Sequence, residues 1–128
     1  MKLLLDTHII LRWVIDPSLL SDESRALIED EVNELFLSVV SVWEIQIKHQ
    51  LGKLDLIVPL DDLVRIQQQN NNLNILPGTL PHVLALDLLP FHHKDPFDRL
   101  LIAQSIQEDF ALVTRDADFS RYPVRLVH

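Results

Sequence analysis

The 128-residue sequence contains no cysteine and only two glycines, Gly52 and Gly78. The absence of cysteine excludes disulfides, thiolate zinc sites and a cysteine nucleophile, and it is typical of a cytoplasmic protein. The scarcity of glycine excludes a glycine-rich phosphate loop, so neither a dinucleotide-binding fingerprint nor a P-loop is present. The sequence also lacks an uncharged apolar run of about 18 residues, which a membrane-spanning helix needs. We therefore expect a cytoplasmic protein that does not enter a membrane.

Positive charge is also scarce, with 11 lysines and arginines against 19 acids and a net charge of −8. A nucleic-acid binder that ignores base sequence needs a basic surface, so the overall charge argues against one. Divalent cations bound at an acidic site would offset part of this charge, however, and a phosphate-bearing substrate is therefore not excluded. The amino-terminal MKLLLDTHII is not expected to be a signal peptide, because Asp6 interrupts its apolar run.

Short apolar segments alternate with helical patterns along what we expect to be one domain, residues 1–128. Strand candidates cover residues 2–5, 35–39, 73–76, 110–114 and 124–127. Helix candidates run to about residue 15, from Ser21 onward, from Ser41 to Gly52, from 61 to about 69, over 80–89 and from Asp95 to about 108. The strands are apolar throughout, which is typical of parallel strands covered on both faces. The sequence predicts an α/β fold: a three-layer α/β/α sandwich with a mostly parallel sheet of about four to five short strands.

The helix that follows residue 40 carries three further expectations. Ser41 is predicted to cap its amino terminus, and Gly52 fits its carboxyl end. Apolar residues recur along it at helical spacing and predict a buried stripe; they are Val40, Trp43, Ile47 and Leu51.

Four carboxylates lie inside or at the edge of these apolar segments. Asp6 ends MKLLLD, Glu44 lies in SVVSVWEIQIKHQLGKL, Asp98 lies in DPFDRLLIAQ and Asp116 follows LVTR. Buried carboxylates are costly and repel one another, and a shared divalent cation would relieve both effects. Oxygen ligands suit Mg²⁺ or Mn²⁺, which assist displacement at phosphorus. Because ligands bind beyond the carboxyl ends of parallel strands, the sequence predicts a metal site there.

Each acid also has a structural alternative. Asp6 could cap the helix that follows it, and Glu44 could lie near a helix start and pair with Lys48 four residues on. Asp116 and Asp118 could form a polar turn after a strand. We take Asp116, nearer the strand end, as the metal ligand and Asp118 as a possible ligand through water.

Asp95 and Asp98 are assigned different roles. Asp95 precedes a proline at the first helical position, which is typical of an N-cap. Asp98 shares a helical stripe with apolar residues and is therefore the predicted ligand. Thr7 and Thr114 are expected to orient ligands or waters by hydrogen bonds, with strand-end capping as their alternative.

Together these segments resemble the PIN domain, and especially the VapC-like toxins of type II toxin–antitoxin systems. LLLDTHIILRW, SVVSVWEIQIKHQLGKL, DPFDRLLIAQSI and LVTRDADF are similar to the family's four blocks, in order. The resemblance implies a Rossmann-like α/β/α sandwich and a Mg²⁺- or Mn²⁺-dependent ribonuclease whose metals activate a water for attack on an RNA phosphodiester. Carried over by position, Asp6, Glu44, Asp98 and Asp116 match the family's acidic quartet. The resemblance also implies a cognate antitoxin and a homodimer.

Two other functions remain open. A metal phosphohydrolase of the haloacid dehalogenase-like kind would need an aspartate two residues after Asp6, where His8 stands. A non-catalytic metal-binding interaction module, such as a receiver-type domain, would need a lysine after a late strand, where Arg115 stands. It would also leave Glu44 and Asp98 without a role.

An RNA substrate would need positive groups near the acids. The candidates close to them in sequence are Arg12, Lys48, Lys53, Lys94, Arg99, Arg115 and Arg121. The sequence singles out none of them, because each could equally be a solvated charge or half of an ion pair.

Overall fold

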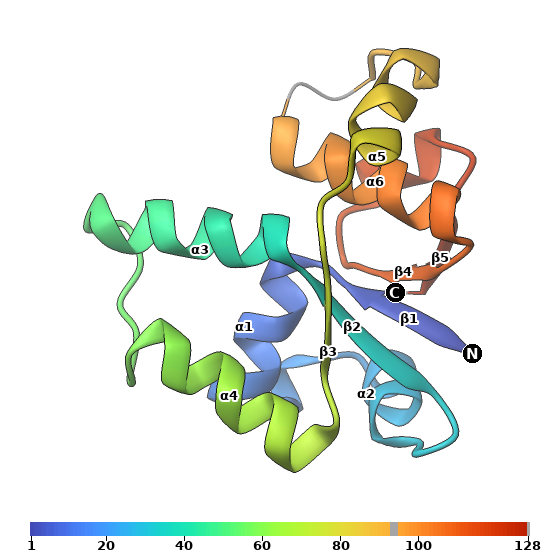
Figure 1. Cartoon of the computed structure of the whole chain (residues 1–128). Coiled ribbons are helices and arrows are strands. Elements are labelled where there is room, and N and C mark those ends of the chain that lie inside the picture. Colours follow the sequence, from blue (N-terminus) through green and yellow to red (C-terminus); the bar gives the residue numbers. More distant parts are fainter. Residues whose placement is uncertain (93–94, 128) are drawn as a thin grey trace.

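The computed structural model describes residues 1–92 and 95–127 and is built around a five-stranded sheet (Figure 1). The strands are β1 (Lys2–Leu5), β2 (Glu34–Ser38), β3 (Asn74–Leu76), β4 (Ala111–Val113) and β5 (Arg125–Val127). Their order is β3-β2-β1-β4-β5, and every neighbouring pair is parallel. The predicted α/β class and parallel sheet are confirmed.

Helices connect the strands. The α-helices are α1 (Thr7–Ile15), α2 (Asp22–Glu29), α3 (Val39–Gln50), α4 (Leu60–Asn71), α5 (Leu80–Ala85) and α6 (Pro96–Glu108). Short 3₁₀ helices are η1 (Pro17–Leu19), η2 (Leu86–Leu88) and η3 (Ala117–Arg121). The predicted helix over residues 80–89 is therefore divided between α5 and η2. Across the described residues, no helix is long and apolar enough to cross a membrane.

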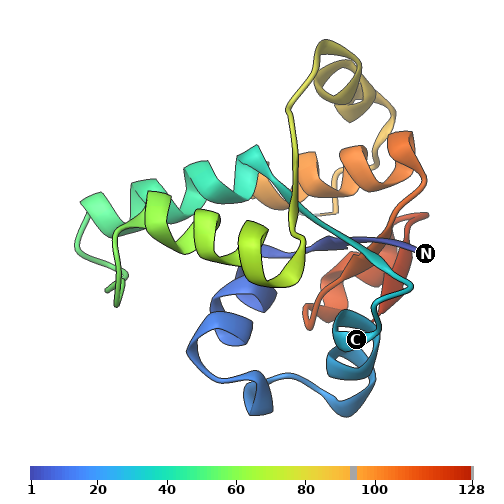
Figure 2. The ribbon, with the colours of Figure 1, turned by 60° about the horizontal axis from the view of Figure 1, so that its bottom comes forward.

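The sheet separates two hydrophobic cores because successive side chains of a strand point to opposite faces. Leu3 and Leu5 of β1 belong to a core that includes residues of α1 and α2. Leu4 belongs to a second core with Leu101 and Ile102 of α6. Figures 1 and 2 show α1 and α2 on one side of the sheet and α5 and α6 on the other. The predicted three-layer sandwich is confirmed.

The strand order places a topological switch point between β1 and β4. From β1 the chain adds β2 and β3 on one side, then crosses over to add β4 and β5 on the other. Leu5 pairs with Val113 at the carboxyl ends of the two central strands. Asp6 continues this pairing, since its backbone N–H donates to the Val113 carbonyl at 2.9 Å. In open parallel sheets, ligands bind in the crevice outside this point.

The start of α3 differs from the prediction. Ser38, not Ser41, is the N-cap, and its Oγ accepts a hydrogen bond from the backbone N–H two residues on. The helix therefore begins earlier, and Ser41 lies buried inside its first turn. The predicted buried stripe is also wrong at Trp43 and Leu51, which are 60% and 63% exposed. Glu44 lies on the inward face instead, because a polar site rather than an apolar core covers that part of α3.

Other predicted helix boundaries are confirmed, at the carboxyl end of α3 and at the starts of α2 and α6. Gly52 follows α3 with a φ of +72°, a left-handed conformation that glycine adopts without steric cost. Ser21 caps α2 by accepting from the Ser24 backbone N–H at 3.1 Å. Asp95 caps α6 with Pro96 at the first helical position, as the sequence indicated.

Candidate active site

Asp6 is a buried carboxylate at the switch point, with 3% of its surface exposed. The Thr114 hydroxyl donates to its Oδ2 at 2.9 Å, and its Oδ1 is buried with no hydrogen-bond partner in the described part of the chain. Burial raises the pKa of Asp6, although the Thr114 hydrogen bond, the nearby His8 and the Thr7 backbone N–H lower it. The charge of Glu44 raises the Asp6 pKa further, which places the two carboxylates within electrostatic reach of one another.

Glu44 is equally buried, but both of its oxygens have partners. The Thr7 hydroxyl donates to Oε1 at 2.7 Å, and the Lys48 ammonium donates to Oε2 at 2.8 Å. Thr7 Oγ1 also lies 3.0 Å from Ser41 Oγ. Thr7 therefore joins the start of α1 to the inward face of α3. The structure thus places hydroxyl contacts from Thr7 and Thr114 on Glu44 and Asp6, and the orienting roles of the two threonines stay predictions.

Asp98 lies half-buried in the first turn of α6. Asp95 accepts hydrogen bonds from the backbone N–H groups of Phe97 and Asp98 at 2.9 and 3.2 Å, which is the structural role predicted for it. The hydrogen bond with Glu44 raises the pKa of Lys48, and the charges of Asp95 and Asp98 raise it further. Lys48 is thus hydrogen-bonded to the acid of α3 and also feels the charge of the acids at the start of α6.

Asp116 follows β4 at the same edge of the sheet. Its backbone N–H donates to Thr114 Oγ1 at 3.0 Å, and its Oδ1 accepts from the Asp118 backbone N–H at 2.9 Å. Asp116 thus caps η3 while its side chain stays partly exposed, and Asp118 is exposed. The turn geometry proposed as the alternative for this pair is present, and their metal roles stay predictions.

A cavity of about 210 Å³ opens between these acids and basic side chains. It is lined by Asp6, His8, Arg12, Arg115 and Asp116. The sequence did not single out its three basic residues. His8 and Arg12 are four residues apart on α1, and Arg115 follows β4. These positions predict a shared cavity only when the strand order is known.

Arg99, another basic candidate, has a structural role. Its guanidinium donates to the carbonyls of Pro90 and Leu86 at 3.0 and 3.3 Å and lies 4.3 Å from the centre of the Phe91 ring. It is 8% exposed and holds the segment before α6 in place. Lys94 lies outside the described residues.

The chemistry of the donors fits a hard divalent cation, since all of them are oxygens and Asp6 Oδ1 still needs a partner. Within residues 1–92 and 95–127, however, no three acidic or histidine side chains converge closely enough to hold a metal ion as they stand. Asp6 and Asp116 line one cavity, and Glu44 is hydrogen-bonded to Thr7, the residue after Asp6. The charge of Asp98 acts on Lys48, the partner of Glu44. The four acids lie at one edge of the sheet, but in the described structure they do not surround a common point.

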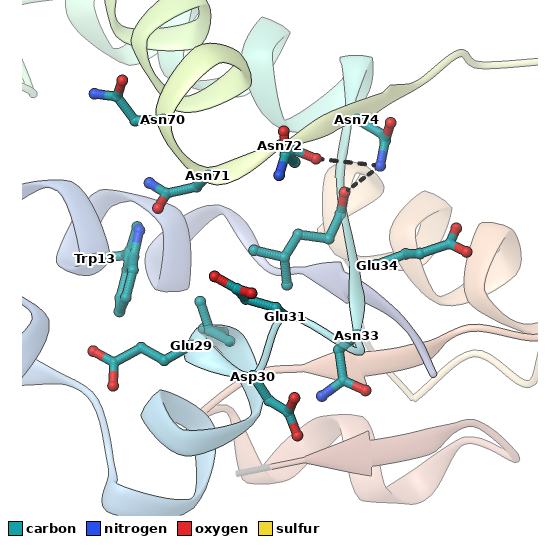
Figure 3. Close-up of a pocket in the computed structure, with 12 residues that line it drawn as sticks. Trp13, Glu29, Asp30, Glu31, Asn33, Glu34, Asn70, Asn71, Asn72 and Asn74 are labelled. Atoms are coloured by element: carbon teal, nitrogen blue, oxygen red, sulfur yellow. Dashed lines mark hydrogen bonds between the residues drawn. The ribbon is translucent and has the colours of Figure 1, made fainter.

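A larger cavity, of about 690 Å³, lies at the opposite, amino edge of the sheet (Figure 3). Its lining is rich in acids and amides, including Glu31, Glu34, Asn72 and Asn74. The side-chain amide of Asn74 donates to the carbonyls of Leu35 and Asn72. None of the four predicted acids lines it.

Comparisons with known proteins agree with this fold. The family model for the PIN domain matches residues 3–125. The chain is 29% identical to Ribonuclease VapC22 of Mycobacterium tuberculosis over 114 residues, which cover 88% of this chain and 85% of that protein. The fold is similar to VapBC2 from Rickettsia felis, bound to a DNA fragment from their promoter, with a TM-score of 0.71, 19% identity and coverage of 99% and 98% of the two chains. It is also similar to a toxin–antitoxin complex from Klebsiella pneumoniae, with a TM-score of 0.59, 18% identity and coverage of 98% and 95%.

Proposed function

The chain belongs to the PIN-domain family, and on that premise we propose that it is a Mg²⁺- or Mn²⁺-dependent endoribonuclease and the toxin of a toxin–antitoxin pair. One observation carries the proposal: two buried carboxylates, Asp6 and Glu44, lie at the switch point of the sheet, and each is held by a threonine hydroxyl. The similarity to Ribonuclease VapC22 supports RNA as the substrate.

In this proposal, Asp6, Glu44, Asp98 and Asp116 are the metal ligands, and Asp118 contributes through water. When bound, the ion supplies positive charge for the phosphate oxygens and acidifies the attacking water. The chain's own residues set the geometry. Thr114 and Thr7 fix the orientation of Asp6 and Glu44, in the way that hydrogen-bonded neighbours commonly orient ligands.

A local group of basic residues supports a polyanionic substrate despite the net charge of −8. Arg12, His8 and Arg115 line the same small cavity as Asp6 and Asp116. The Arg115 guanidinium also donates to the Leu19 carbonyl at 3.2 Å, which ties it to η1. We propose that the arginines contact a backbone phosphate of the RNA next to the cleaved bond.

The alternatives gain no support from these observations. A haloacid dehalogenase-like enzyme still lacks its second aspartate, since His8 occupies that position and lies at the surface. A receiver-type module gives no reason for Glu44 to be buried beside Asp6. Membership of the PIN family agrees with the nuclease and with neither alternative.

Partners are part of the proposal. The similar Klebsiella pneumoniae structure is a toxin–antitoxin complex, and this supports an antitoxin partner for the present chain. We further propose a homodimer, following the family resemblance, and a cytoplasmic location.

The direct test incubates purified protein with total RNA and either Mg²⁺ or Mn²⁺. Controls contain EDTA, or replace the protein with Asp6→Asn. We expect discrete products that depend on the metal and are absent from both controls. Cleavage by pure Asp6→Asn protein at the wild-type rate would refute the assignment of the site.

A further inference from the structure

Lys48 is a cation that the proposed reaction does not use, although it lies within the acidic site. Its Nζ is 2.8 Å from Glu44 Oε2, and its side chain is 38% exposed whereas that of Glu44 is 4% exposed. The other oxygen of Glu44 is held by Thr7. Each oxygen of Glu44 thus accepts a hydrogen bond, in contrast to Asp6, whose Oδ1 has no partner among residues 1–92 and 95–127.

The position of Lys48 also places it close to the acids of α6. The hydrogen bond with Glu44 is the largest of the effects that raise the Lys48 pKa, and the charges of Asp95 and Asp98 add to it. The Lys48 ammonium thus already supplies positive charge to Glu44, the role that a divalent ion held by Glu44 would also fill.

We propose that Lys48 is an internal counter-ion of the acidic site, which competes with the divalent cation for Glu44. This inference rests on the proposed function only in taking Glu44 as a metal ligand. The ammonium lies 2.8 Å from Glu44 Oε2 and balances its charge, so a metal ion bound by Glu44 would have to take its place. Two cations beside one carboxylate repel each other, so metal binding displaces the ammonium towards solvent.

A simple helix-stabilising pair is the competing interpretation, because Glu44 and Lys48 are four residues apart on α3. A pair that served only to stabilise the helix would add little to the stability of the protein and would leave metal binding unchanged. The two interpretations therefore differ in a measurable way. Only a counter-ion in the site makes metal affinity depend on the charge at position 48.

The test measures Mn²⁺ binding to the purified full chain by calorimetry, without RNA. Lys48→Met keeps most of the apolar stem and removes the charge, and Lys48→Arg keeps the charge. Lys53→Met is the matched control, since it removes one exposed positive charge just after the same helix. We expect Lys48→Met to bind Mn²⁺ at least about tenfold more tightly than the wild type, as expected from removing one cation close to a divalent ion. Lys53→Met and Lys48→Arg should stay within about twofold of the wild type.

The melting temperature gives a second readout, because its change on adding Mn²⁺ is measured separately for each variant. Without metal, Lys48→Met should melt below the wild type, because Glu44 loses its counter-ion. Saturating Mn²⁺ should raise its melting temperature by more than that of the wild type. Equal or weaker Mn²⁺ binding by Lys48→Met, relative to Lys53→Met, would overturn the proposal. Absence of Mn²⁺ binding in every variant would overturn it as well, and the RNA assay then judges the nuclease separately.

Discussion

The two edges of the sheet carry acids in different ways. The cavity at the amino edge is the larger of the two and is lined by more carboxylates, namely Glu29, Asp30, Glu31 and Glu34 (Figure 3). All four are exposed to solvent, and Glu29 forms an ordinary surface ion pair with Arg25. The carboxyl edge has a smaller cavity, but its acids include two that are almost completely buried.

The difference shows that the burial of the acids and their hydrogen bonds from hydroxyl groups identify the site better than cavity volume or the number of acids. Asp6 and Glu44 keep their positions at the cost of lost hydration, and hydroxyl groups from neighbouring elements hold them there. The amino-edge acids lose no hydration and need no partner. Buried carboxylates with shifted pKa values, such as Asp6, are typical of functional sites.

Removing a charge at each edge gives the largest expected contrast. Asp6→Asn should lower metal-dependent RNA cleavage by at least roughly 10³-fold, because a carboxylate that binds the metal supports several kcal/mol of transition-state stabilisation. Glu31→Gln removes the same charge at the amino edge and should leave the rate within about twofold. Initial rates on one RNA substrate measure both. Similar losses in the two variants would show that the acidic charge of the whole protein, rather than the site, matters.

Much of this contrast could be predicted from the sequence. Asp6 follows a run of leucines that is predicted to lie in the core, and Asp116 follows a similar apolar segment. The strand order was not needed to expect them at the same edge, since parallel strands end together. Glu44 was predicted as a ligand although the expected apolar stripe of α3 was wrong at Trp43, which is exposed.

The remainder depends on contacts between residues far apart in the chain. The Thr7 hydroxyl meets Glu44 across 37 positions, and Thr114 meets Asp6 across 108. The cap of α3 was misplaced because Ser38 and Ser41 are equally good caps by residue type, and tertiary burial of Ser41 decides between them. No local pattern encodes the strand order that brings Arg115 to the cavity of Asp6.

The support at the carboxyl edge can be tested without touching a carboxylate. Thr7→Val removes the hydroxyl that bonds Glu44 Oε1 and keeps the shape of the side chain. We expect cleavage to fall roughly 10- to 100-fold, as is common when a ligand loses its orienting partner. Thr7→Ser should restore most of the activity. An unchanged rate in Thr7→Val would mean that Glu44 is positioned by α3 alone.

The basic side of the cavity predicts a smaller effect on substrate binding. The Arg12 guanidinium has no hydrogen bond or ion pair within the described part of the chain, so it is available to a phosphate. Arg12→Ala should raise KM roughly fivefold with little change in kcat, and should lower the salt dependence of RNA binding by about one ion. Arg65→Ala is the control, because Arg65 pairs with Asp62 on α4 and does not line the cavity. Equal effects in both variants would count against a phosphate contact at Arg12.

The smallest expected effect concerns stability in the absence of metal. Burial raises the pKa of Asp6 in the folded protein above its ordinary value of 3.8. At a pH between 3.8 and this raised pKa, the folded protein keeps a proton on Asp6 that the unfolded chain has released. The free energy of unfolding therefore falls as pH rises through this window and stays low above it. Asparagine cannot ionise, so at neutral pH Asp6→Asn should be more stable than the wild type by on the order of 1 kcal/mol, or roughly 4 °C.

This advantage should shrink as the pH falls to and then below 3.8, because Asp6 becomes protonated in the unfolded chain as well as in the folded protein. Urea unfolding in EDTA across that range measures it, with Glu31→Gln as the exposed-acid control. Mn²⁺ should then reverse the order, because an ion that binds only the folded wild type raises its stability by mass action and has lost a ligand in Asp6→Asn. A wild type that is more stable than Asp6→Asn at every pH in EDTA would mean that the Thr114 hydrogen bond outweighs the burial of the charge. The two edges would then differ in their contacts but not in stored electrostatic cost.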